Sequence, residues 1–63
     1  MRLSKSKMYS VTKFYLDDNK QDENMGIWNG ADVRIIIGNA KYDETFGMFF
    51  PASNQYAFEV TEI

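Results

Sequence analysis

The sequence predicts a small all-β domain, either an antiparallel meander or an open barrel of four to five strands. Aromatic residues make up 16% of the 63 residues, and they gather with β-branched residues in short stretches that turn-forming residues separate. The final stretch alternates between apolar and polar positions, as a half-buried strand does. No stretch keeps helical spacing over about 11 residues, so we expect at most one short helical turn, near residues 40–45.

The first part of the chain predicts an arm, a strand and an exposed connection. Residues 1–6 lack hydrophobic periodicity and predict a flexible basic arm. Lys7–Leu16 is rich in aromatic and β-branched residues and has no helix cap, which predicts the first strand. Asp17–Asn24 contains no apolar residue and predicts a solvent-exposed connection. This run lacks the central glycine and the final glutamate of an EF-hand loop, so no calcium site is expected.

A hairpin is expected next, at Asn29-Gly30. This dipeptide is the strongest short-range signal for a type I′ turn, in which both central residues need positive φ. Trp28 would then end one strand, and the next strand would begin just after the turn and continue through Val33–Ile37.

Two apolar stretches, Val33–Ile37 and Phe46–Phe50, carry large hydrophobic side chains at successive positions. As strands they would present these side chains on both faces, because neighbouring residues point to opposite sides of a sheet. Ile36 and Phe49 would then point outward as an apolar patch. Pro51–Asn54 predicts a turn before the last strand. The expected inner face consists of Val33, Ile35, Ile37, Phe46, Met48, Phe50, Tyr56, Phe58 and Val60.

Composition limits the chemistry that the protein can carry out. From Met1 to Ile63 the chain is expected to be a complete small protein with one domain, residues 1–63. It has no cysteine and no histidine, which excludes disulfides, Ser-His and Cys-His nucleophile pairs and the commonest zinc ligands. Its acidic residues fall in runs that are expected to be exposed. We therefore expect no enzymatic activity, no cofactor, no metal site and no small-molecule substrate.

Protein–protein contact is the function that the sequence favours. A chain of this length buries only about 60% of its unfolded surface, so association between chains would add stability. The expected binding patch consists of Ile36 and Phe49, with Trp28 and Tyr15 beside them as aromatic anchors. The prediction is a non-enzymatic accessory or inhibitory protein that forms a homodimer or modulates a larger host complex, as proteins encoded by viruses and mobile elements often do.

A cytoplasmic location is expected. The N-terminus carries basic residues but no apolar segment after them, unlike a secretion signal. No apolar run approaches the roughly 20 residues that cross a bilayer.

Binding of single-stranded nucleic acid is the alternative function. The formal net charge of −2 argues against broad electrostatic capture of nucleic acid. Basic and aromatic residues nevertheless recur together along the predicted strands, as they do in small β-domains that bind single strands. The candidate residues are Lys7, Lys13, Tyr15, Arg34 and Phe49.

Two short segments resemble known families. Phe46–Phe50 is similar to the aromatic strand of RNA-recognition domains, although the chain has no room for the two helices of that fold. A strand that ends at Gly38, followed by Gly47-Met48-Phe49 and Pro51, resembles the SpoVG family of small β-rich proteins. That alignment requires gaps and implies no residue roles.

Overall fold

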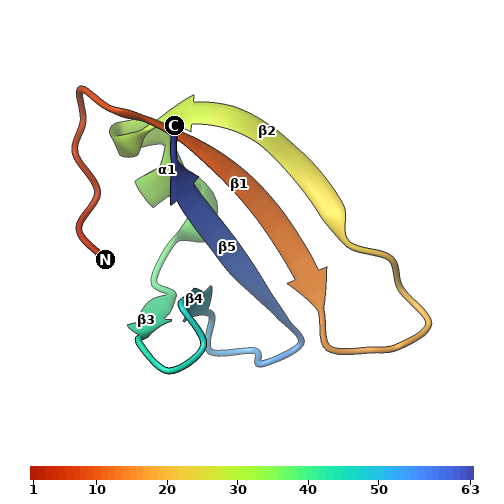
Figure 1. Ribbon diagram of the computed structural model, residues 1–63. Coiled ribbons are helices and arrows are strands. Elements are labelled where there is room, and N and C mark those ends of the chain that lie inside the picture. Colours follow the sequence, from red (N-terminus) through yellow and green to blue (C-terminus); the bar gives the residue numbers. More distant parts are fainter.

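The computed structural model describes every residue from Met1 to Ile63 and shows five antiparallel strands in one open sheet with one short helix (Figure 1). The strand order across the sheet is β2-β1-β5-β4-β3. The prediction of a small all-β meander is confirmed. The elements are β1 (Met8–Tyr15), β2 (Glu23–Asn29), α1 (Gly30–Ile37), β3 (Lys41–Asp43), β4 (Met48–Phe50) and β5 (Tyr56–Glu62).

The two central strands, β1 and β5, are those that the sequence predicts most directly. They pair in continuous register from Tyr9↔Glu62 to Tyr15↔Tyr56. Richness in aromatic and β-branched residues predicts β1, and alternation of apolar and polar residues predicts both β5 and its buried face, because a shift of one residue would turn the apolar side chains toward solvent.

The predicted hairpin turn at Asn29-Gly30 and the strand after it are both wrong, because the helix α1 begins at Gly30 in place of a turn and a strand. Asn29 caps the helix, since its Oδ1 accepts a hydrogen bond from the backbone N–H of Asp32 at 2.8 Å. Val33 and Ile37 are buried in the core. These two residues are four positions apart, which places them on one face of a helix.

The remaining apolar residues of α1 lie off this buried face. Ile35, predicted to face inward, is 78% exposed, and Ile36 is half-buried against the core. Gly38, with φ 60°, ends the helix, and its N–H donates to the Arg34 carbonyl at 3.1 Å. The apolar run therefore supplies one helical stripe rather than two faces of a strand.

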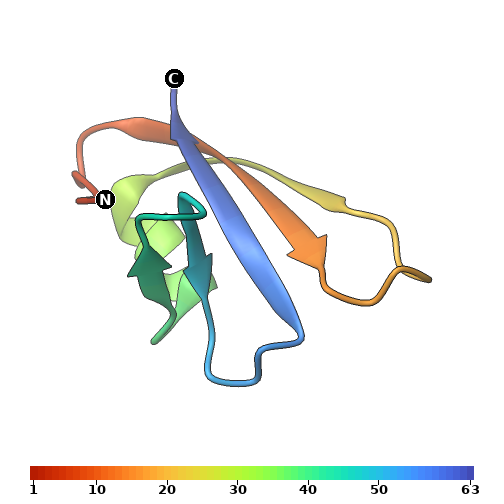
Figure 2. The same ribbon diagram turned by 60° about the horizontal axis from the view of Figure 1, so that its bottom comes forward.

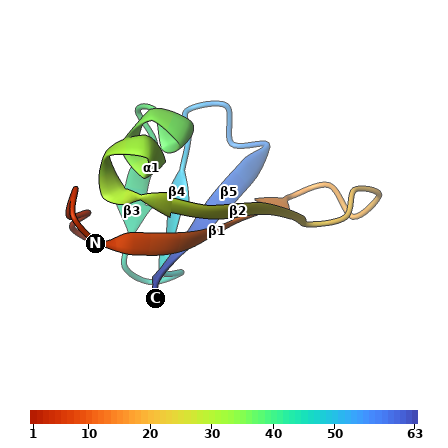
Figure 3. The ribbon, with the colours of Figure 1, turned by 90° about the horizontal axis from the view of Figure 1, so that it is seen from above.

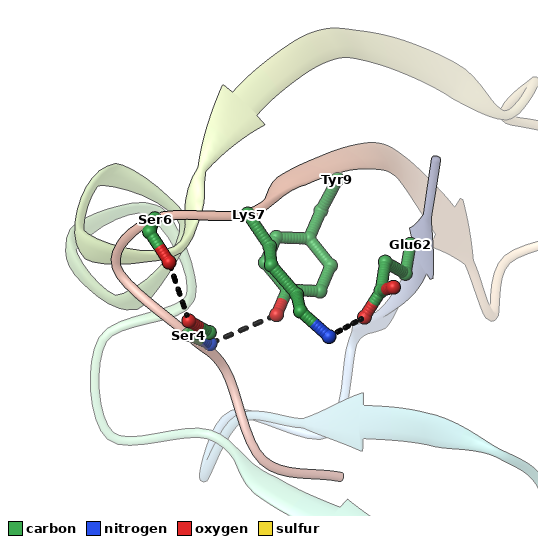
Figure 4. Close-up of polar contacts among 5 residues, drawn as sticks. All are labelled: Ser4, Ser6, Lys7, Tyr9 and Glu62. Carbon is green, nitrogen blue, oxygen red and sulfur yellow. Dashed lines mark hydrogen bonds and ion pairs between the residues drawn. The ribbon is translucent and has the colours of Figure 1, made fainter.

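Glycine is needed at position 30 because two chain segments approach each other closely there, and not because a turn requires positive φ. Its φ is not positive, but a Cβ there would collide with the main-chain carbonyl of Ser4. The Gly30 N–H donates to the Lys7 carbonyl at 3.1 Å, and the Ser4 N–H donates to the Tyr9 hydroxyl at 2.8 Å (Figure 4). Leu3 packs against the core. The segment predicted to be a flexible arm is thus in contact with the folded domain.

The hydrophobic core lies between α1 and one face of the sheet. Phe49 is 2% exposed and belongs to this core, so the prediction that it points outward is wrong. Phe46, predicted to face inward, is 65% exposed. The cause is register, because Phe49 lies directly opposite the buried Phe58 and the two share a face of the sheet. The core consists of Tyr9, Val11, Val33, Ile37, Ala40, Phe49, Phe58 and Val60.

The short strand β3 occupies the segment near residues 40–45, for which at most one helical turn was expected. A tight turn follows, in which Asp43 Oδ1 accepts hydrogen bonds from the backbone N–H groups of Thr45 and Phe46 at 2.8 and 3.3 Å. β3 and β4 form the short-stranded edge of the sheet (Figure 2). The predicted turn at Pro51–Asn54 is confirmed by a hydrogen bond from its last N–H to its first carbonyl at 3.1 Å.

The helix covers only one end of the sheet, and the hairpin of β1 and β2 extends beyond it (Figure 3). The molecule is accordingly elongated, with extents of 35 × 20 × 19 Å. Residues 16–22 connect the two strands and are exposed. Exposure was predicted for 17–24, of which Glu23 and Asn24 belong to β2, and Leu16 was predicted to end the first strand. No helix of this structure has the length and apolar character needed to cross a membrane.

Candidate functional site

Residues at the end of β1, in the connection after it and at the start of β5 line the largest concavity of the molecule. This end of the two strands lies away from α1 (Figure 1). The concavity is a half-open cleft of about 600 Å³. We refer to it as the lysine–tyrosine cleft. Its lining residues are Lys13, Tyr15, Leu16, Asp17, Lys20, Gln55 and Tyr56.

Strand register brings the main side chains of the cleft together. Lys13 and Tyr15 are two residues apart on β1 and therefore point to the same face. Tyr15 lies directly opposite Tyr56 on β5, and such cross-strand pairs share a face. This is the face on which Val11 is buried farther along β1. The cleft is thus the uncovered continuation of the surface that forms the core.

Ammonium groups lie close to both tyrosine rings. Lys13 Nζ is 4.1 Å from the centroid of the Tyr56 ring and 5.0 Å from that of Tyr15. Lys20 Nζ lies 5.1 Å from the centroid of the Tyr15 ring. These distances are in the cation–π range. The two rings meet at 62° with centroids 6.2 Å apart, so the cleft combines tilted aromatic surfaces with two positive charges.

Hydrogen bonds hold the edge of the cleft in place. The Tyr15 hydroxyl donates to Glu23 Oε1 at 2.7 Å. The Leu16 N–H donates to the Gln55 carbonyl at 3.0 Å, which joins the connection after β1 to the start of β5. The Lys20 N–H donates to the Asp17 carbonyl at 3.0 Å, and this turn directs Lys20 back toward Tyr15.

Known proteins offer no guide to this cleft. Comparison with protein-family models, curated proteins and solved structures finds no match. The resemblance of the second half to the SpoVG family is therefore not supported by a family match. The cleft has to be interpreted from its own chemistry.

The predicted partner-binding residues do not form one patch. Phe49 is buried in the core beneath α1, and Ile36 packs half-buried against that core. Trp28 lies on the edge strand β2, is 39% exposed, and donates from Nε1 to the Met25 carbonyl at 2.8 Å. Tyr15 belongs to the cleft at the other end of β1. Burial of Phe49 removes the centre of the predicted patch.

The predicted nucleic-acid residues divide into two groups. Lys13 and Tyr15 come together in the cleft. Lys7 lies at the opposite end of β1, where its Nζ is 3.5 Å from Glu62 Oε1 (Figure 4). Arg34 projects from α1, with its guanidinium carbon 5.9 Å from the centroid of the buried Phe49 ring. Neither Lys7 nor Arg34 lines the cleft.

Sequence reasoning did not select the second lysine and the second tyrosine of the cleft, Lys20 and Tyr56. Lys20 belongs to the polar connection, in which no local pattern shows that the chain turns back. Tyr56 was assigned to the inner face, and it does pack half-buried against the core. The helix α1 cannot cover the whole of β1, although both have eight residues, because a strand rises about 3.3 Å per residue and a helix about 1.5 Å. This signal could not be used because the segment of α1 was predicted to be a strand.

Proposed function

We propose that this chain is a non-enzymatic binding protein that takes single-stranded nucleic acid into the lysine–tyrosine cleft. The observation that carries the proposal is the position of Lys13 Nζ, within 5.0 Å of the ring centroids of both Tyr15 and Tyr56. Aromatic rings next to ammonium groups are the combination by which small β-domains bind single strands, since bases stack on the rings and phosphates meet the cations.

The sequence favoured protein contact over nucleic-acid binding, and we propose the opposite order on the basis of two observations. Phe49, the centre of the expected apolar patch, is buried. Lys13 and Tyr15, from the alternative set, lie side by side and gain Lys20 and Tyr56 as neighbours. The proposed site is therefore smaller than the set predicted from the sequence and lies at one end of the sheet.

Acidic residues near the cleft should limit its affinity for single-stranded nucleic acid. Asp17 lines the cleft and Glu23 holds the Tyr15 hydroxyl, while Asp18 and Asp22 belong to the same connection. Their charges oppose long-range attraction of phosphates. Stacking should therefore contribute more to binding than charge does, and the salt dependence should be shallow.

Substitutions in the cleft should weaken binding of a labelled oligothymidine. Tyr56→Ala should lower the affinity by about 5- to 150-fold, because one stacked base is worth about 1–3 kcal/mol. Lys13→Gln should lower it by a smaller factor and flatten the salt dependence. Fluorescence anisotropy at several salt concentrations measures both effects, with far-UV circular dichroism to show that each variant is folded.

Lys7→Gln is the matched control, because Lys7 lies at the other end of β1, in an ion pair with Glu62. It should bind as the wild type does. Equal weakening by Lys7→Gln and Lys13→Gln would mean that only net charge matters. A wild-type protein that binds no oligonucleotide at low salt would contradict the proposal itself.

Neutralising the acidic connection should have the opposite effect. Asp18→Asn together with Asp22→Asn should tighten oligothymidine binding several-fold at low salt, and the gain should vanish at high salt because exposed charges are screened. Glu44→Gln together with Glu59→Gln changes the net charge equally, away from the cleft, and should have little effect. The same anisotropy titration compares the two double variants, and an equal gain from both would show that the acids of the connection play no local part.

Contact with another protein, in an accessory or inhibitory role, is a second candidate function. The observation that favours it is the exposed ring of Phe46, presented on a turn that Asp43 holds with two hydrogen bonds. A rigid exposed aromatic is typical of an interface anchor. A photo-crosslinking amino acid at position 46, but not at the exposed Ser53, should then capture one defined protein other than a second copy of this chain. Both functions are proposed for a cytoplasmic protein.

A further inference from the structure

The edge strand β3 has a free side. It pairs with β4 through Lys41↔Phe50, Tyr42↔Phe49 and Asp43↔Met48. It is the last strand of the sheet, and no backbone hydrogen bond joins its other side to another segment of the chain. A free edge offers its unpaired N–H and C=O groups to another strand.

The sequence of β3 is complementary to itself. If a second copy pairs antiparallel about a two-fold axis through Tyr42, each Lys41 lies opposite the Asp43 of the other copy, so that two ion pairs form. Tyr42 shares the inner face with the buried Phe49, so Lys41 and Asp43 lie on the outer face. Lys41 is exposed and Asp43 is half-buried. Opposite charges at directly paired positions stabilise strand pairing.

Apolar surface lies next to these charges. A shallow groove of about 340 Å³ lies over the hairpin of β3 and β4 and includes Lys41 and Asp43 in its lining. Phe46 stands at this groove with 65% of its surface exposed, and its ring packs edge-on against Phe50 with centroids 5.6 Å apart. The other edge of the sheet is less suited to pairing, because a bulge at Gly26, with φ 96°, interrupts the register of β2.

We propose that two copies of this chain associate through β3, with reciprocal Lys41 to Asp43 pairs and the Phe46 rings covered at the flanks. The two sheets then form one continuous sheet across the two-fold axis. Three-residue strands give few hydrogen bonds, so the dimer is weak and forms at high protein concentration. This surface shares no residue with the lysine–tyrosine cleft and does not depend on nucleic-acid binding.

Sedimentation velocity over a range of protein concentrations tests the proposal. The wild type should dimerise, and Lys41→Glu should weaken dimerisation by about tenfold or more, because two attractive pairs become two repulsive ones. Asp43→Asn, which keeps an oxygen for the turn, should weaken it less. Lys20→Glu makes the same charge change in the cleft and should leave dimerisation unchanged while it impairs oligonucleotide binding.

The decisive measurement is the double variant with Lys41→Glu and Asp43→Asn. Asparagine weakens the dimer when it faces lysine, but it should strengthen the dimer when it faces glutamate, because the repulsion disappears. Recovery of most of the loss caused by Lys41→Glu is therefore expected. Additive weakening in the double variant would overturn the proposed register. A wild type that stays monomeric up to about 1 mM, or a Lys41→Glu variant that dimerises as well as the wild type, would overturn the interface.

Discussion

Phe49→Ala is expected to lower the free energy of unfolding by about 3–5 kcal/mol. Phe49 is 2% exposed, lies opposite Phe58, and packs against Tyr42 with ring centroids 5.0 Å apart. A domain of this length has a total stability of about 3–9 kcal/mol, at about 0.05–0.15 kcal/mol per residue. The substitution should therefore remove a large part of that stability and leave a measurable unfolded population in water. Guanidinium titration followed by far-UV circular dichroism measures the change.

Phe46→Ala is the matched control, since it removes the same side chain three positions earlier in the chain. Phe46 is 65% exposed, so the loss of stability should stay within about 0.5–1 kcal/mol. Alternation along a strand from Phe46 to Phe50 would predict the reverse, with the larger loss of stability on substitution of Phe46. A larger effect at Phe46 than at Phe49 would mean that β4 pairs with β5 in a register shifted by one residue.

Gly30→Ala is expected to cost about 1–3 kcal/mol of stability, although alanine favours helices by about 1 kcal/mol over glycine. The new Cβ would collide with the main-chain carbonyl of Ser4, which cannot rotate away as a side chain can. The protein can relieve the collision only by moving the N-terminal segment, at the cost of the contact of Leu3 with the core and the hydrogen bond from Ser4 to Tyr9. Thermal and guanidinium unfolding both report the loss.

Removal of residues 1–5 separates this collision from any effect within the helix. The deletion lowers stability by itself, but in the shortened chain Gly30→Ala should be neutral or slightly stabilising, because the Ser4 carbonyl is gone. The difference between the two backgrounds is the coupling energy of the contact. An equal loss in both backgrounds would locate the cause in the first turn of α1 instead.

The segments that were predicted correctly are those whose local residue pattern specifies their secondary structure. In β5, Tyr56, Phe58 and Val60 alternate with smaller or polar residues as far as Thr61, and β1 is rich in β-branched and aromatic residues over its eight positions. Such stretches specify both strand and face locally. The hairpin prediction at Asn29-Gly30 was wrong because this dipeptide suits both a hairpin turn and the start of a helix. In the structure Asn29 caps the helix, and the close approach of Ser4 explains the glycine at position 30.

By itself the sequence determined that the protein is a small β-sheet domain, that β1 and β5 are strands, that the polar connection after β1 is exposed, and that Pro51–Asn54 forms a turn. Only the tertiary structure decided three matters: the apolar run ending at Ile37 is helical, Phe49 rather than Phe46 is buried, and Lys20 and Tyr56 join Lys13 and Tyr15 in one cleft. The physical reason is the separation along the chain between the residues that determine each feature. Alternation is read within one strand, whereas the face of a short strand and the neighbours of a loop depend on pairing with segments far away in the chain.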